Sequence, residues 1–136
     1  MLKYFSVMLG GGIGASLRYF ISLLTANFMP FFYCTFIINI AGCLFFGFIT
    51  YLAINKPDFN PNFKLFLTTG IAGGFTTFST FGYESFSLLQ KGHIETCLIY
   101  ISLSLIAGII SALTGMLAGK SVAEFQYKLS TKDITA

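Results

Sequence analysis

Four apolar stretches occupy most of this chain, at about residues 4–28, 31–54, 66–89 and 97–118. Each reaches the ~20 residues that an α-helix needs to cross the ~30 Å hydrocarbon core of a bilayer. Only 10% of the residues are charged, whereas a soluble domain carries about 25%. The sequence therefore predicts one all-α membrane domain over residues 1–136, with four transmembrane helices and a short polar C-terminal tail.

The third apolar stretch contains a segment that should interrupt its helix. Residues 70–81 read GIAGGFTTFSTF and carry three glycines and four hydroxyl side chains. Each glycine weakens a helix by roughly 1 kcal/mol relative to alanine. In lipid, a broken helix survives only where the freed backbone groups are buried in protein or face an aqueous path. We therefore expect a broken third helix beside such a path.

Enzymatic functions receive no support from the sequence. Residues 10–15 read GGGIGA and fit a glycine-rich nucleotide fingerprint, but no βαβ unit surrounds them and the first acidic residue is Asp58. Ser79 could be a nucleophile only with a base, and the single histidine, His93, falls in a short polar loop. We expect the protein not to be an enzyme, and not to bind nucleic acid.

Small residues at four-residue spacing on every predicted helix indicate close packing. Gly10 and Gly14 are one such pair, and Gly70 and Gly74 are another. In lipid, small residues let helix backbones approach closely. Four short helices enclose little interior, so the sequence favours an oligomer. The three cysteines, Cys34, Cys43 and Cys97, are interpreted as small apolar fillers.

Basic residues are distributed unequally between the two ends of the predicted bundle. With four helices, both termini share one side, which holds Lys3, Lys56, Lys64, Lys120, Lys128 and Lys132. The other side has Lys91 and, at most, Arg18. The excess of positive charge favours cytoplasmic termini.

Polar and aromatic residues within the apolar stretches are the candidate functional residues. Asn39 either joins two helices by a hydrogen bond or offers its N–H donors to a passing anion. Phe78 and Phe81 share one helix face beside Ser79 and Thr80, and the positive edge of a phenylalanine ring can meet an anion. With no lysine or arginine among them, these groups predict a site from which a small anion can leave again.

Four further polar positions are expected near this path or in its support. Tyr100 and Ser104 lie four residues apart on one face of the last helix and would form a polar track. Arg18 and Glu84 fall toward helix ends, where a vestibule position or a pairing would relieve the cost of a charge in the bilayer.

These motifs together resemble the CrcB/Fluc fluoride channels. The resemblance rests on GGIGASLRY at residues 11–19, on NIAG at residues 39–42 and on GGFTTFSTF at residues 73–81, and it covers all four predicted helices. It implies a fluoride-specific ion channel in the cell (cytoplasmic) membrane, which lets fluoride leave the cytoplasm passively and lowers its toxicity. It also implies an antiparallel, dual-topology-type dimer with two pores at the subunit interface.

Individual roles follow from the resemblance, position by position. The carbonyls of Gly73 and Thr76 would hold a structural sodium ion that is not transported. Asn39, Phe78, Phe81 and Thr80 would line the fluoride pore, beside Ser79, and Tyr100 and Ser104 would form the polar track. Glu84 falls where the family often has an acidic residue near the pore mouth. Gly108 departs from the pattern, because a further hydroxyl is expected one turn beyond Ser104.

Two questions stay open at this point. The unequal loop charge fits one fixed-orientation half of a heterodimer of paralogues as well as a homodimer. Other functions for a small four-helix membrane protein are a dimeric exporter of cationic drugs, although no glutamate is present in the first apolar stretch, and a non-transporting membrane subunit.

Overall fold

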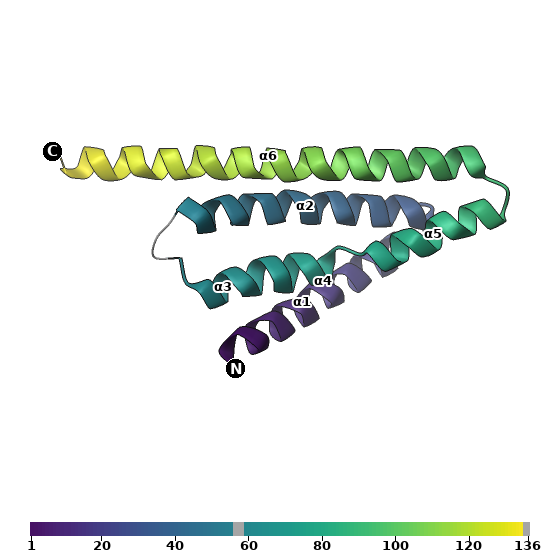
Figure 1. Cartoon of the computed structure of the whole chain (residues 1–136), viewed down its shortest axis with the longest axis horizontal. Coiled ribbons are helices and arrows are strands. Elements are labelled where there is room, and N and C mark those ends of the chain that lie inside the picture. Colours follow the sequence, from purple (N-terminus) through teal and green to yellow (C-terminus); the bar gives the residue numbers. More distant parts are fainter. Residues whose placement is uncertain (56–58, 135–136) are drawn as a thin grey trace.

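The computed structural model describes the backbone of residues 1–55 and 59–134 and the side chains of residues 1–55 and 59–125. Every element in these ranges is helical, which confirms the predicted all-α class. The long helices are α1 (Leu2–Thr25), α2 (Phe31–Asn55) and α6 (Ile94–Ile134). The remaining elements are α3 (Pro61–Leu65), the π-helical η1 (Phe66–Ala72), α4 (Gly73–Phe75) and α5 (Phe78–Gln90). Both termini lie toward the same end of the molecule (Figure 1).

Three helices are long and apolar enough to cross a membrane: α1, α2 and the part of α6 from Ile94 to Phe125. The third predicted helix is instead divided. Elements α3, η1 and α4 run into one another, the chain then becomes extended, and α5 continues toward the opposite end (Figure 1). The structure thus confirms the predicted break in the third helix.

The break consists of two extended residues. Thr76 has ψ 155°, and Thr77 has φ −145° and ψ 116°. Thr77 is also the N-cap of α5, because its Oγ1 accepts the Thr80 N–H at 3.2 Å. Preceding the break, η1 is wound as a π-helix, which is itself often found at functional sites. The interruption is therefore a structured turn rather than a frayed helix.

Several helix ends differ from the predicted boundaries, for identifiable reasons. α1 ends at Thr25, before residue 28. The third segment starts at Pro61 rather than 66, because the Asn60 side chain accepts the Asn62 and Phe63 N–H groups and Pro61 occupies the first helical turn. α6 starts at Ile94 rather than 97, directly after the connection that contains Gly92, whose φ is 78°.

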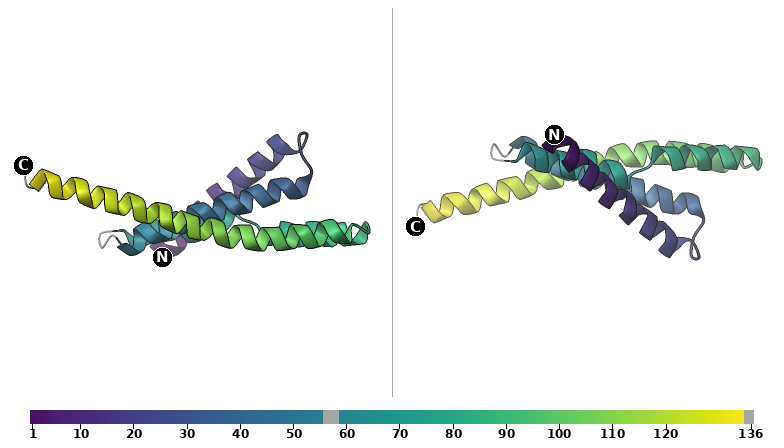
Figure 2. Two further views of the ribbon diagram at one scale, coloured as in Figure 1. Left: turned by 90° about the horizontal axis from the view of Figure 1, so that it is seen from above. Right: turned by 90° about the horizontal axis from the view of Figure 1, so that it is seen from below.

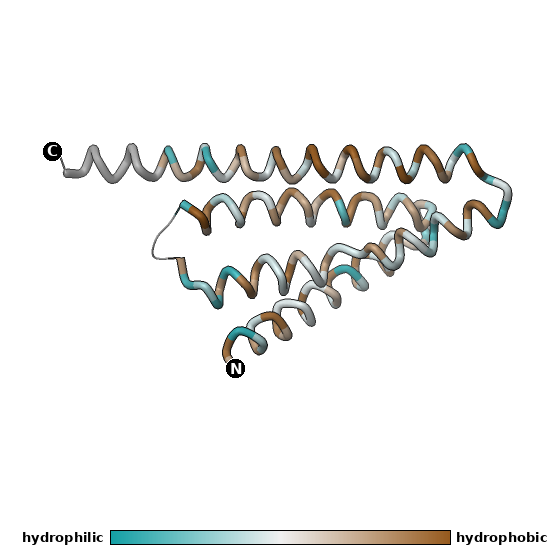
Figure 3. Tube along the Cα trace, viewed as in Figure 1, coloured by the Kyte–Doolittle hydropathy of each residue, from teal (hydrophilic) through white to brown (hydrophobic). Residues whose placement is uncertain are grey.

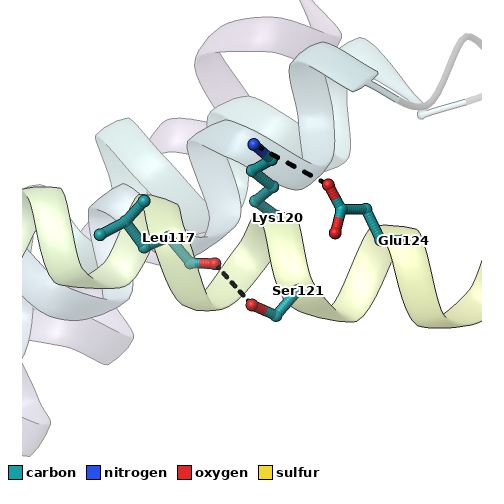
Figure 4. Close-up of polar contacts among 4 residues, drawn as sticks. All are labelled: Leu117, Lys120, Ser121 and Glu124. Atoms are coloured by element: carbon teal, nitrogen blue, oxygen red, sulfur yellow. Dashed lines mark hydrogen bonds and ion pairs between the residues drawn. The ribbon is translucent and has the colours of Figure 1, made fainter.

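The residues expected to form a polar tail are helical. α6 continues past residue 118 to Ile134, because no glycine or proline follows Gly119 to end it. Within this extension, Lys120 Nζ lies 3.8 Å from Glu124 Oε1, and Ser121 Oγ donates to the Leu117 carbonyl (Figure 4). Both charged side chains are more than half exposed, so the ion pair adds little stability.

Close backbone contacts hold the elements together. α2 lies along α6, and α1 crosses η1 and α4. A Cβ added at Gly14 would collide with the Ile71 carbonyl, and one added at Gly74 would collide with the Gly11 carbonyl. These two glycines therefore allow α1 to lie directly against the segment before the break. At the far end, α1 and α2 diverge from α5 and α6 (Figure 2).

Most apolar surface of the single chain faces outward. Only 11% of the most apolar window of α1, and the same share of that of α6, is buried inside the chain. Hydrophilic residues lie on α3 and on the part of α6 level with the nearby end of α2, toward the end that holds the termini (Figure 3). Lys3, Lys64 and Lys120 belong to this end, while Lys56 and the side chains of Lys128 and Lys132 lie outside the described residues.

Candidate functional site

Asn39 is the residue that fixes the break to the rest of the fold. Its Oδ1 accepts the Thr77 backbone N–H at 2.8 Å, and its Nδ2 donates to the Thr77 carbonyl at 3.1 Å. This pair of bonds joins α2 to the extended turn. It matches the interpretation of Asn39 as a residue that connects two helical segments by hydrogen bonds. Nδ2 carries a second N–H, which remains available for a ligand.

The same hydrogen bonds free two backbone carbonyls. In a continuous helix, the Thr77 N–H would bond to the Gly73 carbonyl and the Thr80 N–H to the Thr76 carbonyl. Here the Thr77 N–H donates to Asn39, and the Thr80 N–H donates to Thr77 Oγ1. Gly73 and Thr76 therefore lose their helical donors, and both residues line a cavity of about 370 Å³ with Gly42 and Cys43.

A second cavity, of about 240 Å³, also lies at the break and shares Cys43 and Thr76 with the first. It is bordered by α2, by the break and α5, and by α6, and its lining consists of Asn39, Cys43, Thr76, Thr77, Phe78, Phe81, Ser104, Leu105 and Gly108. Four predicted pore residues therefore come together at one place, from three elements. Among the residues that the structure describes, no charged side chain lines this cavity.

Aromatic rings form one wall of this cavity. The ring centroids of Phe78 and Phe81 are 5.7 Å apart with the planes tilted by 42°, and Phe81 in turn lies 5.1 Å from the Tyr100 ring. Tilted rings present edges as well as faces to their surroundings. Phe78 is 81% exposed in the single chain, so one side of the cavity wall is open to whatever lies beside this face.

The hydroxyl of Ser104 is buried and has no hydrogen-bond partner among the described residues. Buried polar atoms in native proteins nearly always have a partner. Because Ser104 lines the cavity of about 240 Å³, an occupant that accepts a hydrogen bond there would satisfy it.

Glu84 lies in a buried hydrogen-bond network between α2, α5 and α6. Its side chain is 6% exposed. Thr35 Oγ1 donates to Oε1 at 2.8 Å, and the Tyr100 hydroxyl donates to Oε2 at 2.7 Å. Tyr100 is thus placed behind Phe81, with its polar end on Glu84. In the single chain, Glu84 joins three elements, and its expected place near a pore mouth stays a prediction.

Arg18, Ser79 and Thr80 lie away from the wall that Phe78 and Phe81 form. Arg18 Nε donates to the Gly74 carbonyl at 3.3 Å, and Arg18 and Thr80 line a separate cavity of about 160 Å³ between α1, α2 and the break. Ser79 Oγ is 3.3 Å from Thr77 Oγ1. The structure therefore brings Asn39, Phe78, Phe81 and Ser104 together around one cavity, whereas Thr80 lines a different one.

Two residues of the site were missed by the sequence analysis. Thr77 caps α5 and bonds Asn39, and Thr35 donates to Glu84. A hydroxyl residue directly before a helix is the usual N-cap signal, so Thr77 could have been found once the break was placed between residues 76 and 77. Thr35 gives no local signal, because its partner is on another helix.

Long apolar helices, a structured break and an uncharged cavity with hydrogen-bond donors define an integral membrane protein of the solute-conducting class. Residues 5–116 match the family model described as "CrcB-like protein, Camphor Resistance (CrcB)". The chain belongs to this family and is a multi-pass membrane protein.

Individual relatives agree over nearly the whole chain. Proteins named "Fluoride-specific ion channel FluC" are similar to it in Azobacteroides pseudotrichonymphae, with 43% identity over 83% of this chain and 92% of the relative. The relative in Flavobacterium psychrophilum is 42% identical over 90% of this chain and 100% of its own length. In Clostridium perfringens the identity is 48%, over 80% of this chain and 87% of the relative.

Proposed function

We propose that this protein is a fluoride-specific channel that lets fluoride leave the cytoplasm passively. The observation that carries the proposal is the shared cavity of Asn39, Phe78, Phe81 and Ser104. The names of the relatives point to the same activity.

The chemistry of the cavity suits a small anion that must enter and leave. The second N–H of Asn39 and the Ser104 hydroxyl are donors, and the ring edges of Phe78 and Phe81 carry partial positive charge. These groups replace hydration without a full positive charge, so they hold the anion weakly enough for release. A compact acceptor such as fluoride gains most from short hydrogen bonds, whereas larger halides gain less.

We further propose that four membrane crossings form in each subunit, the third being α3 to α5 with its break. Two subunits would associate antiparallel, with the exposed Phe78 face against the partner. The partner is a second copy or a paralogue. Exposed Phe78 and Gly73 support this arrangement, because a polar path at this face needs a cover that excludes lipid.

The carbonyls of Gly73 and Thr76 are suited to a structural sodium ion. Both have lost their helical donors to the hydrogen bonds of Asn39 and Thr77, and a hard monovalent cation binds oxygen ligands. When bound, the ion would supply positive charge at the interface of the two subunits and satisfy these carbonyls. Replacing sodium by N-methylglucamine in all buffers should then lower the fraction of dimer, and an unchanged dimer would exclude the ion.

The test of the function is ion efflux from liposomes that hold the purified protein. Fluoride should leave rapidly and chloride should remain. Equal rates for the two ions, or no fluoride efflux from a monodisperse dimer, whether it is formed by this chain alone or by this chain with a paralogue, would contradict the proposal.

A further inference from the structure

The polar face of α6 is interrupted inside the cavity of about 240 Å³. Tyr100, Ser104 and Gly108 follow one another at four-residue spacing and therefore share a helix face. Ser104 and Gly108 both line the cavity, but Gly108 contributes no side chain there. A hydrogen-bonding path along α6 would end at Ser104 unless another element supplies a group at the level of Gly108.

Cys43 on α2 supplies such a group. A Cβ added at Gly108 would lie 3.8 Å from Cys43 Sγ, so the thiol lies directly opposite the missing side chain. Cys43 is also four residues after Asn39, on the same face of α2, and both line the cavity. Within the described part of the chain, no hydrogen bond involves Cys43 Sγ.

Cys43 and Thr76 are the two residues that line both cavities at the break. Cys43 borders the cavity of Asn39 and Ser104, and it also borders the cavity of Gly73 and Gly42. The unpartnered, buried hydroxyl of Ser104 shows that this region calls for a hydrogen-bonding occupant. By contrast, Cys34 is 4% exposed and Cys97 is 0% exposed, and each takes part in hydrogen bonds within the fold.

We propose that the thiol of Cys43 lines the fluoride path and replaces the hydroxyl that Gly108 lacks. Its S–H is a weak donor and would serve an anion that passes between Ser104 and the break. This inference rests on the proposed function and assigns to Cys43 a place in that path. From the sequence alone, Cys43 is interpreted only as an apolar filler.

The first test is a rescue experiment, with fluoride efflux from liposomes as the readout. Cys43→Val replaces the thiol by an apolar side chain and removes the donor, and should slow efflux by about twofold, the worth of a hydrogen bond at the weak end of the usual range. Cys43→Ser should keep most of the rate. Adding Gly108→Ser to Cys43→Val should restore efflux, because the added Cβ meets only ordinary contacts.

The second test is chemical, and its first readout, the extent of thiol modification, does not depend on activity. In a Cys34→Ala/Cys97→Ala variant, methyl methanethiosulfonate should modify Cys43, as measured by intact mass, and should slow fluoride efflux. In a Cys43→Ala variant that keeps the other two cysteines, the reagent should leave efflux unchanged.

The outcomes separate this inference from the proposed function. A wild-type dimer without fluoride efflux, whether homodimeric or formed with a paralogue, would contradict the function itself. Wild-type efflux with an undiminished rate in Cys43→Val, no rescue by Gly108→Ser, or an unmodified Cys43 would overturn only the role of the thiol.

Discussion

At the residue scale, Asn39 determines which backbone groups are free at the break. It accepts from the N–H of Thr77 and donates to the carbonyl of the same residue. Because the Thr77 N–H donates to Asn39, the Gly73 carbonyl loses its helical donor. The second amide N–H of Asn39 remains for the cavity of about 240 Å³. One side chain thus connects the candidate cation ligands with the candidate anion path, although Gly73 lines one cavity and Asn39 the other.

Phe81 should matter for conduction and not for folding. Phe81→Ile keeps an apolar side chain in the cavity wall but removes the ring edge, whose contact with an anion is worth about 1 kcal/mol. We expect fluoride efflux to fall by about fivefold, with unchanged elution on size exclusion. Phe86→Ile is the matched control, because Phe86 lies on the same helix, is 56% exposed and does not line the cavity. Equal rates in the two variants would remove the Phe81 ring from the mechanism.

The Glu84 network should contribute to stability. Tyr100→Phe leaves Oε2 of Glu84 without the hydroxyl that donates at 2.7 Å, and interhelical hydrogen bonds in membrane proteins are worth about 1 kcal/mol. We expect a lower Tm in detergent for Tyr100→Phe. Tyr83→Phe serves as the control, because Tyr83 is 72% exposed. A Tm for Tyr100→Phe as high as that of the control would show that Glu84 finds other partners.

At the scale of elements, the position of the break depends on how closely α1 approaches η1 and α4. Arg18 donates to the Gly74 carbonyl, and glycines on both sides permit backbone contact. The crossing keeps the segment before the break in place, while the N-cap at Thr77 starts α5 in a new direction. Both features are needed, because an extended turn inside a membrane protein is stable only with fixed partners.

A comparison of two glycines on α1, Gly12 and Gly14, distinguishes the effect of helix packing from the effect of helix propensity. Gly14→Ala would place a Cβ against the Ile71 carbonyl, whereas Gly12→Ala meets nothing within 4 Å. The two changes raise intrinsic helix propensity by the same ~1 kcal/mol. We therefore expect Gly14→Ala to reduce the yield of monodisperse protein and to lower its Tm, and Gly12→Ala to leave both unchanged or improved. Equal behaviour of the two variants would contradict the α1 crossing.

The helices and the break can be predicted from the sequence where residues close together along the chain determine them. Adjacent Gly73 and Gly74 in an apolar run were enough to predict the break, and apolar length was enough for α1, α2 and α6. The α6 extension beyond Lys120 was missed, because polar composition indicates solvent exposure but does not end a helix. The network of Glu84 with Thr35 could not be predicted, since it depends on how α2 lies against α5.

At the scale of the whole molecule, the two ends differ in charge. The end with both termini carries Lys3, Lys64 and Lys120, whereas the other end carries Lys91 in the connection between α5 and α6. Such a bias favours one orientation in the membrane. An antiparallel homodimer, however, requires that each chain insert in both directions. These two demands oppose each other in this protein, and the orientation can be measured directly.

Cysteines at opposite ends of the molecule will show which demand prevails. In a background without native cysteines, Leu2→Cys marks the end with the termini, where Leu2 is 65% exposed, and His93→Cys marks the other end. An impermeant thiol reagent added to intact cells should label a fraction of each variant, because an antiparallel homodimer exposes both ends on the outside. Labelling of His93→Cys alone would mean that every chain has cytoplasmic termini. In that case the antiparallel partner must be a paralogue, and this chain, purified alone, should fail to carry fluoride until that second chain is expressed with it.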